Sequence, residues 1–242
     1  MLAEGWSPEQ ISGFLRVWHA GNAGMQISHE TIYKTLFIGS RTVLPRKLTK
    51  HLRTRRPLRK HKKNTVKGQL RSQIAGAVSI HERPKEVEAR SSAGHWDGDL
   101  VLGGGVTQIA TLVERASRFA VLVQLDGRDM VTVAGRLVEE IDRLPAAAIK
   151  PITWDRGMEL ARHATITERT GVDVYFADAR SPWQRATNEN TNGLVRQYLP
   201  KGSSFATLTQ DQLDHIAARL NNRPRKSLGY QTPAKVLEAM LR

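Results

Sequence analysis

Hydrophobic and polar positions alternate regularly over the second half of the chain, and the period of the alternation changes from segment to segment. Short runs rich in Val, Ile, Leu and Phe predict strands, whereas longer stretches with apolar residues three or four positions apart predict helices. The expected strands cover residues 95–102, 107–115, 118–125, 149–154 and 172–176, and the expected helices cover residues 131–144, 159–170, 182–198, 210–220 and 233–241. This order predicts an α/β domain in which a three-strand meander joins two parallel strands, giving a five-stranded mixed sheet with flanking helices.

Two short helices are predicted ahead of the α/β domain. The segment Ser7-Pro8-Glu9-Gln10 is typical of a helix start, with Ser as the N-cap and Pro in the first turn, and Ser28 is expected to cap a second helix. The pair, joined by a Gly-containing turn, suggests a helix-turn-helix whose second helix enters a major groove. His29, Thr31 and Lys34 are then the exposed candidates for DNA contact. A helical hairpin that only packs or dimerises fits the pattern equally well.

The net charge of +14 is concentrated between these two regions. Residues 41–72 contain 13 Lys and Arg and no acid, so the rest of the chain holds 37 − 13 = 24 basic and 23 acidic residues. A nucleic acid is the natural partner of such a segment, because binding releases condensed counterions. The candidate contacts are Arg53, Arg55, Arg56, Lys60, Lys62 and Lys63. A soluble linker without a partner is the alternative, and a membrane surface is less favoured because the segment has no aromatic or Leu-rich face.

The chain therefore divides into a helix-turn-helix-like segment (1–40), a basic linker expected to be mobile without DNA (41–88), and an α/β domain with C-terminal helices (89–242). No apolar run reaches the roughly 18 residues needed to cross a bilayer, and the first residues do not form a signal peptide. The absence of cysteine excludes disulfides and thiolate zinc sites and fits a reducing cytoplasm. His163 and His215 have no close paired ligand, which disfavours a zinc enzyme.

Three acidic residues lie on predicted strands or helices at positions from which a side chain can reach a bound ligand. Asp99 lies within the first strand, Asp155 follows an apolar strand directly, and Glu189 lies about two turns into a predicted helix. A charge within a core strand is costly unless it binds something, and strand ends line the crevice where ligands bind. Three carboxylates on separate elements could hold two Mg²⁺ or Mn²⁺ ions. Taken singly, each would be interpreted as a surface acid or a helix cap, as Asp97 and Asp178 are.

These acids belong to a set of ordered motifs that resembles the DDE signature of integrase-core transposases. The motifs closely match the IS thirty family of bacterial insertion sequences, and they span nearly the whole chain. They are Trp6-Ser-Pro-Glu-Gln-Ile-Ser, Gly94-His-Trp-Asp-Gly-Asp-Leu, Asp155-Arg-Gly-Met-Glu159, Ser181-Pro-Trp-Gln-Arg, Asn188-Glu-Asn-Thr-Asn-Gly, Arg196-Gln-Tyr-Leu-Pro-Lys201 and Leu220-Asn-Asn-Arg-Pro-Arg-Lys-Ser-Leu-Gly-Tyr. The 33 residues between Asp155 and Glu189 are also typical of these enzymes.

The resemblance implies an RNase H-like integrase catalytic core in which Asp99, Asp155 and Glu189 are catalytic and ligate two Mg²⁺ or Mn²⁺ ions. The enzyme would hydrolyse a phosphodiester at the terminal inverted repeats of its element, and the freed 3′-hydroxyl would attack double-stranded target DNA. A homodimer or larger assembly would bridge two DNA ends at the bacterial nucleoid, in the cytoplasm and away from any membrane.

Several polar residues around the predicted site are candidates for DNA contact. Asn192, Arg196 and Lys201 are expected to contact phosphates, with simple solvation as the alternative. Trp183 and Gln184 are candidates for contact with unpaired bases. For Trp183, packing in the core is the expected role instead.

Two departures from the family pattern bear on function. Ala186 stands where the family usually has Gly, and only a mild effect is expected in a helix. Family members usually carry a further helical DNA-binding segment ahead of the Trp6-Ser-Pro motif, whereas this chain begins almost at that motif, which implies an internal start or a truncation. The main alternative function is therefore a catalytically silent, transposase-derived DNA-binding regulator. A cellular RNase H-like nuclease or resolvase is disfavoured by the order of the motifs.

Overall fold

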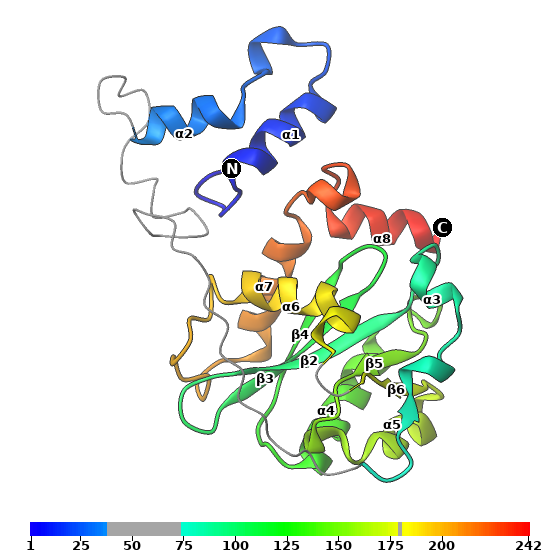
Figure 1. The fold of residues 1–242 in the computed structure, drawn as a ribbon. Helices are drawn as coiled ribbons and strands as arrows, with labels where there is room; N and C mark the ends of the chain where they lie inside the picture. The colour runs from blue at the N-terminus through cyan, green and yellow to red at the C-terminus, as the bar shows by residue number, and fades with distance from the viewer. Residues whose placement is uncertain (38–73, 179–180) are drawn as a thin grey trace. The chain divides into compact units, whose positions relative to one another are not determined.

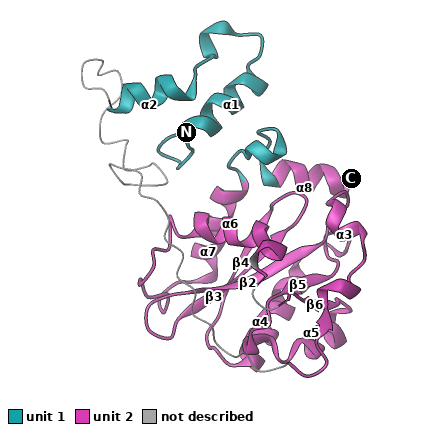
Figure 2. Cartoon of the chain, in the orientation of Figure 1, with its two compact units in different colours: residues 1–68, 222–233 teal, residues 69–221, 234–242 magenta. Residues whose placement is uncertain are grey.

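The computed structural model describes residues 1–37, 74–178 and 181–242 (Figure 1). The chain forms two compact units (Figure 2). The helical unit contains residues 1–68 and 222–233, and the α/β unit contains residues 69–221 and 234–242. The predicted contacts from Arg53 to Lys63, and the predicted mobility of the basic segment, lie outside the described residues.

A six-stranded mixed sheet organises the α/β unit (Figure 1). The strands are β1 (Val78–Ser79), β2 (Trp96–Leu102), β3 (Gln108–Glu114), β4 (Ala120–Gln124), β5 (Ile152–Trp154) and β6 (Val174–Phe176), in the order β1-β6-β5-β2-β3-β4. β2, β3 and β4 form an antiparallel meander, whereas β1, β6, β5 and β2 pair in parallel. β2 is therefore the strand at which the direction of pairing changes, and the crevice beside such a point is where ligands bind in open sheets.

Helices cover both faces of the sheet and enclose two hydrophobic cores. One face packs against α4 (Met130–Arg143) and α5 (His163–Thr170), through a core that includes Trp96, Leu112 and Phe176. The other face packs against α6 (Ala186–Val195) and α7 (Gln210–Asn221), through Val101, Ile109 and the buried leucines of both helices. Successive residues of β2 therefore point alternately into two different environments.

The predicted α/β fold is confirmed, and the structure adds one strand to it. Residues 74–88 are assigned to the linker by the sequence, but they contribute β1, a 3₁₀ helix (Ile80–Glu82) and the short helix α3 (Glu86–Ala89). The apolar side chains of Ile74, Ile80 and Val87 are buried and hold this segment to the α/β unit. Isolated apolar residues of this kind do not give a periodic pattern, so the sequence alone did not reveal the sheet edge.

Local signals set most helix boundaries correctly. Asp129 caps α4 by accepting from the amides of Val131 and Thr132, and Gly171 ends α5 in the left-handed conformation with φ of 72°. The helix expected over 159–170 is instead a 3₁₀ turn (Met158–Leu160) followed by α5, and the helix expected over 182–198 begins as a 3₁₀ turn (Pro182–Arg185) before α6. Further 3₁₀ turns cover Ala146–Ala148 and Lys226–Leu228, and α8 covers Pro233–Leu241. None of the described helices combines the length and the apolar character that crossing a membrane requires.

The helical unit contains α1 (Pro8–Trp18), a 3₁₀ turn (Ala23–Met25) and α2 (His29–Phe37). The predicted capping box is present, because Ser7 and Gln10 each accept from the other's backbone amide. Ile11 and Leu15 of α1 pack against Ile32 and Leu36 of α2 in a small core. Such a pair is compatible with a DNA-reading motif and with a hairpin that only packs.

Residues 222–233 form the remaining part of the helical unit and contact α1 directly. The Gln10 side-chain amide donates to the Pro224 carbonyl at 2.8 Å, and Lys226 pairs with Glu9 at 2.6 Å. A Cβ added to Gly13 would lie 2.1 Å from the nearest ring carbon of Tyr230, so the ring occupies the space that any other residue would fill. Residues more than 200 positions apart therefore form one interface within the helical unit.

Two glycines inside helices allow a matched test of this interface. Nothing lies within 4 Å of a Cβ added to Gly135 of α4, so Gly135→Ala should stabilise the chain by about 1 kcal/mol through helix propensity. Gly13→Ala should instead destabilise the helical unit by about 1–3 kcal/mol, because Tyr230 must move. Urea denaturation measures both changes, and hydrogen exchange of α1 and residues 222–233 localises the second. Equal stabilisation by the two substitutions would contradict the Gly13–Tyr230 packing.

Candidate active site

Two of the three predicted acids lie side by side where β2 and β5 run parallel. Trp96 and Asp97 of β2 are in register with Ile152 and Thr153 of β5. Continuing this register by two residues brings Asp99 opposite Asp155, the first residue after β5. The side chains are 28% and 19% exposed, so both carboxylates remain accessible from solvent.

An unusually close contact joins the two residues that come directly before these acids, Gly98 and Trp154. A Cβ added to Gly98 would lie 2.0 Å from the Trp154 indole. The indole is fully buried and its Nε1 lies 3.4 Å from a carboxylate oxygen of Glu159. Gly98 is therefore required for close approach rather than for an unusual backbone angle, and it fixes where the two strands bring their carboxylates. No local pattern in the sequence marks Gly98 for this role, because the indole that it contacts belongs to a strand more than 50 residues away.

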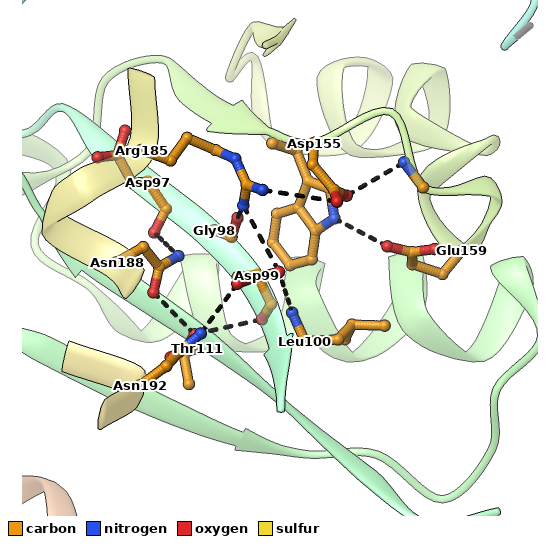
Figure 3. Close-up of polar contacts among 12 residues, drawn as sticks. Asp97, Gly98, Asp99, Leu100, Thr111, Asp155, Glu159, Arg185, Asn188 and Asn192 are labelled. Atoms are coloured by element: carbon orange, nitrogen blue, oxygen red, sulfur yellow. Dashed lines mark hydrogen bonds and ion pairs between the residues drawn. The ribbon is translucent and has the colours of Figure 1, made fainter. Parts of the chain in front are cut away.

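Arg185 connects the two carboxylates (Figure 3). One guanidinium nitrogen lies 3.5 Å from Asp99 Oδ1, and the other terminal nitrogen lies 3.5 Å from Asp155 Oδ2. The first nitrogen also donates to the Gly98 carbonyl at 3.1 Å. The two acids therefore share one cation, which is the arrangement of charge that a metal ion would also need.

A polar network under α6 orients Asp99. The Asn192 amide donates to Asp99 Oδ2 at 2.9 Å, and its oxygen lies 3.0 Å from the Thr111 hydroxyl, which is opposite Asp99 on β3. The Asn188 amide donates to the Asp97 carbonyl at 3.0 Å (Figure 3). This explains the run of asparagines in α6, a residue type that is otherwise unfavourable in helices. Burial raises the pKa of Asp99, Arg185 opposes that effect, and the neighbouring charge of Asp155 adds to it.

Glu189, the third predicted acid, lies on α6 at an exposed position. It precedes Asn192 by three residues, which is one helical turn, so its Cα lies on the side of α6 that faces Asp99. Its carboxylate makes no hydrogen bond or ion pair within the part of the chain that the structure describes. No three His, Asp or Glu side chains among the described residues converge on one point that could hold a metal ion. The structure thus brings Asp99 and Asp155 together, whereas Glu189 lies on α6 with its carboxylate exposed.

Asp97 is not the surface acid that the sequence suggested. It is fully buried on the same face of β2 as Asp99, and one Arg115 nitrogen lies 2.7 and 3.0 Å from its two oxygens. Burial raises the pKa of Asp97, and the charges of Arg115 and Arg83 oppose that effect. Arg83 in turn donates to Thr153 and pairs with Glu88. Asp97 therefore anchors the start of β2, and Arg83 and Glu88 of the segment 74–88 form part of its surroundings.

Asp178, the other acid interpreted as a surface residue, is 35% exposed and pairs with His81.

The predicted DNA contacts fall into different environments. His29, Thr31 and Lys34 are exposed along α2, and Lys201 is exposed beyond α6. Arg196 donates to the carbonyls of Leu102 and Leu199, and burial lowers its pKa.

Trp183 does not pack in the core, contrary to the sequence prediction, because its side chain is 71% exposed. The neighbouring Gln184 bonds to Asp178 through its amide group. Ala186 begins α6, where it needs no special backbone angle.

Comparison with known families and solved structures shows what the α/β unit is similar to. Residues 89–182 match the family model of the integrase core domain. The matched region contains Asp99 and Asp155 and ends before α6. Among solved structures, the catalytic core domain of bovine immunodeficiency virus (BIV) integrase aligns with a TM-score of 0.46 and 16% identity, covering 61% of this chain and 95% of that one.

Curated relatives extend the similarity over nearly the whole chain. The transposase InsI of the insertion sequence element IS30A from Escherichia coli K12 is 50% identical over 234 residues, which are 96% of this chain and 61% of the relative. The transposase of element IS1086 from Cupriavidus metallidurans is 42% identical, covering 99% of this chain and 70% of that protein. The transposase of element IS4351 from Bacteroides fragilis is 39% identical, with 96% and 69% covered. The chain thus spans about three fifths of the length of the IS30A relative.

The close contact of Gly98 with Trp154 can be tested by a double-mutant cycle. Gly98→Ala should lower the free energy of unfolding by about 1–3 kcal/mol, since the indole must move. Trp154→Leu removes the ring that conflicts with the new methyl group, so the double variant should lose less stability than the two single variants together. Denaturation of the four proteins gives a coupling expected to be at least about 0.5 kcal/mol. Strictly additive losses would rule out the contact as the reason for glycine at this position.

Substitution of the two acids of β2 by the neutral residue Asn should change the stability of the chain to different extents. Asp97→Asn leaves Arg115 buried without a full counter-charge, so the free energy of unfolding should fall by about 3–5 kcal/mol. Asp99→Asn, at a more exposed position with a shared and longer ion pair, should leave the stability nearly unchanged. Thermal and urea denaturation measure both. A fully stable Asp97→Asn variant would show that the buried pair does not anchor β2.

Proposed function

The chain belongs to the IS30 family of insertion-sequence transposases, and from that premise we propose that it is a DDE transposase, which cuts the ends of its element and joins them to target DNA with the help of divalent metal ions. The observation that carries this proposal is the convergence of Asp99 and Asp155 on a single cation. Two carboxylates that approach so closely on neighbouring central strands repel each other and destabilise the fold unless a positive charge lies between them. Such a pair is characteristic of a site that binds a cation.

The donor set fits a hard divalent cation. Asp99 and Asp155 offer carboxylate oxygens, and Mg²⁺ and Mn²⁺ prefer oxygen ligands. The Arg185 guanidinium stands in for such a cation at 3.5 Å from each acid. We assign Asp99, Asp155 and Glu189 as the metal ligands, with two Mg²⁺ or Mn²⁺ ions; Glu189 would join them by a change of its rotamer or a small shift of α6. Bound ions would stabilise charge on the attacking and leaving oxygens of a phosphoryl transfer.

The residues of the chain then have distinct roles in the reaction. Asn192 holds one oxygen of Asp99 and so orients the carboxylate toward the crevice. In the first step, water forms a bond to phosphorus at the end of the element, and the bond to the 3′-oxygen breaks to release a 3′-hydroxyl. In the second step, that hydroxyl attacks a phosphodiester of the target strand, and one ester bond replaces another. No covalent bond to the protein is needed.

We propose that DNA binds to parts of the chain other than the Asp99–Asp155 pair. His29, Thr31 and Lys34 are candidates for base or phosphate contact from α2, and the basic residues between 53 and 63 are candidates for phosphate contact. Lys201 and Arg196 would contact phosphates near the site. A homodimer at the bacterial nucleoid, bridging two terminal repeats, is proposed because a transposition event must hold both ends of the element.

A DNA-binding regulator without catalytic activity is the second candidate. One observation favours it: Glu189 is exposed and does not contact the other two acids in this structure. The two functions make different predictions about metal dependence and about acid substitutions, so one set of assays separates them.

The test is a nicking and strand-transfer assay with Mg²⁺ or Mn²⁺ on DNA that carries the flanking terminal repeats. Asp99→Asn, Asp155→Asn and Glu189→Gln should each lower cleavage by at least about a hundredfold, since each removes a charged metal ligand. DNA binding, measured by gel shift, should be retained in all three. Glu168→Gln is the matched control, because this acid is exposed on α5, which covers the face of the sheet opposite α6; cleavage should persist.

Intact DNA binding without cleavage by the unsubstituted chain would favour the regulator. Cleavage that survives Glu189→Gln but not the two aspartate substitutions would contradict the triad while keeping the enzyme.

A further inference from the structure

The Arg185 side chain occupies the space between the two acids although it bonds poorly there. Both of its ion-pair distances are 3.5 Å, whereas an optimal charge-assisted hydrogen bond is about 2.7–2.9 Å long. Its Nε is buried without a hydrogen-bond partner. Among the described residues, its one short contact is with the Gly98 carbonyl, at 3.1 Å. A guanidinium has five donors, and most of them are used weakly or not at all in this position.

Burial makes this arrangement significant, because the side chain is only 14% exposed. Arg115 contacts both oxygens of Asp97 at 2.7 and 3.0 Å, although its Nε is also buried without a hydrogen-bond partner among the described residues. Arg185 instead balances two negative charges at equal and longer distances of 3.5 Å. Within the described part of the chain, one conventional hydrogen bond holds the Arg185 side chain there, so its position depends mainly on the charge of the acid pair.

A divalent cation that binds Asp99 and Asp155 must take the same place. Two positive charges cannot share so small a space, because their repulsion in a partly buried site is large. Arg185 would have to leave as the ion enters. Its long side chain starts from the last residue of the 3₁₀ turn before α6, and the loss of one backbone hydrogen bond is a small cost.

We infer that Arg185 is an exchangeable counter-ion: it neutralises the Asp99–Asp155 pair in the metal-free chain, is displaced when a divalent ion binds, and then binds a DNA phosphate next to the site. This inference rests on the proposed function for the presence of metal and DNA at the site. A guanidinium released beside a loaded metal site is well suited to a phosphate, which it grips with two parallel hydrogen bonds.

Exchange of Arg185 between the acid pair and DNA would link metal binding to DNA binding. Metal must compete with Arg185, so its affinity for the free chain is weakened. DNA removes the competitor by offering it a phosphate, so metal and DNA each strengthen the binding of the other by the same factor. Arg185 would thereby discourage metal loading, and hence reaction, before DNA is present.

The experiment measures Mn²⁺ binding to the full chain, by electron paramagnetic resonance of the free ion and by calorimetry. Arg185→Gln should bind Mn²⁺ about tenfold more tightly than the unsubstituted chain, a change of roughly 1.4 kcal/mol. Arg185→Lys, which retains the charge, should bind Mn²⁺ almost as the unsubstituted chain does. Arg136→Gln is the matched control: Arg136 is also partly buried and donates to a backbone carbonyl, that of Gln124, but lies on α4. It should leave Mn²⁺ affinity unchanged.

The second arm measures coupling with a mixed-sequence DNA duplex, because phosphate binding does not depend on sequence. Adding duplex should tighten Mn²⁺ binding to the unsubstituted chain by about as much as Arg185→Gln does without DNA. The same duplex should change the Mn²⁺ affinity of Arg185→Gln little, and Arg185→Lys should give a reduced coupling because an ammonium cannot form the paired hydrogen bonds. Circular dichroism checks that each variant is folded.

Weaker or unchanged Mn²⁺ binding by folded Arg185→Gln would overturn the inference, since Arg185 would then support the ligands instead of competing with metal. Coupling that persists in Arg185→Gln would overturn the assignment of phosphate to this residue. Equal Mn²⁺ binding by the unsubstituted chain and Asp99→Asn would show that the binding does not depend on the acid pair. That result would contradict the proposed function itself.

Discussion

The packing of the Trp154 indole against Gly98 holds the central strands β2 and β5 in the relationship on which the site depends. Each of these residues precedes an acid, so the contact that buries the indole also sets the separation of Asp99 and Asp155. Close-packed interiors resist small changes in volume, and a contact without room for one methyl group is a stiff constraint. A rigid pair of strands is a suitable support for metal ligands, because their positions do not have to be organised during the reaction.

The same strand shows two solutions to the cost of a buried carboxylate. Asp97 has a fixed partner in Arg115, with short contacts to both oxygens and no exposure, and this pair belongs to the permanent structure. Asp99 shares Arg185 with Asp155 at longer distances and remains partly open to solvent. Both solutions neutralise charge in a medium of low dielectric constant. They differ in contact length and exposure, and in our proposal they differ also in that the counter-charge of Asp99 and Asp155 is exchanged when a metal ion binds.

Helix α6 joins these features, because one of its faces carries Asn188 and Asn192 to the acidic strand while the turn before it carries Arg185. The same 3₁₀ turn also presents Trp183 to solvent. A modest movement of this helix would alter the counter-ion, the orientation of Asp99 and the approach of Glu189 together. Such linkage is a physical route from the DNA binding that we propose beside α6 to the geometry of the site.

The sequence alone predicted most of the secondary structure and the α/β fold, and it nominated the three acids as candidates, because these signals act between residues a few positions apart or follow the order of the motifs. Periodicity, the Ser7 capping box and the spacing of the motifs are all local or ordered along the chain. Tertiary structure alone decided that Asp97 is buried, that Trp183 is exposed, and that Arg185 reaches Gly98 from 87 residues away. Whether an isolated charged or aromatic side chain is enclosed depends on which elements pack around it. That information arises only when distant segments meet, so no local pattern could have contained it.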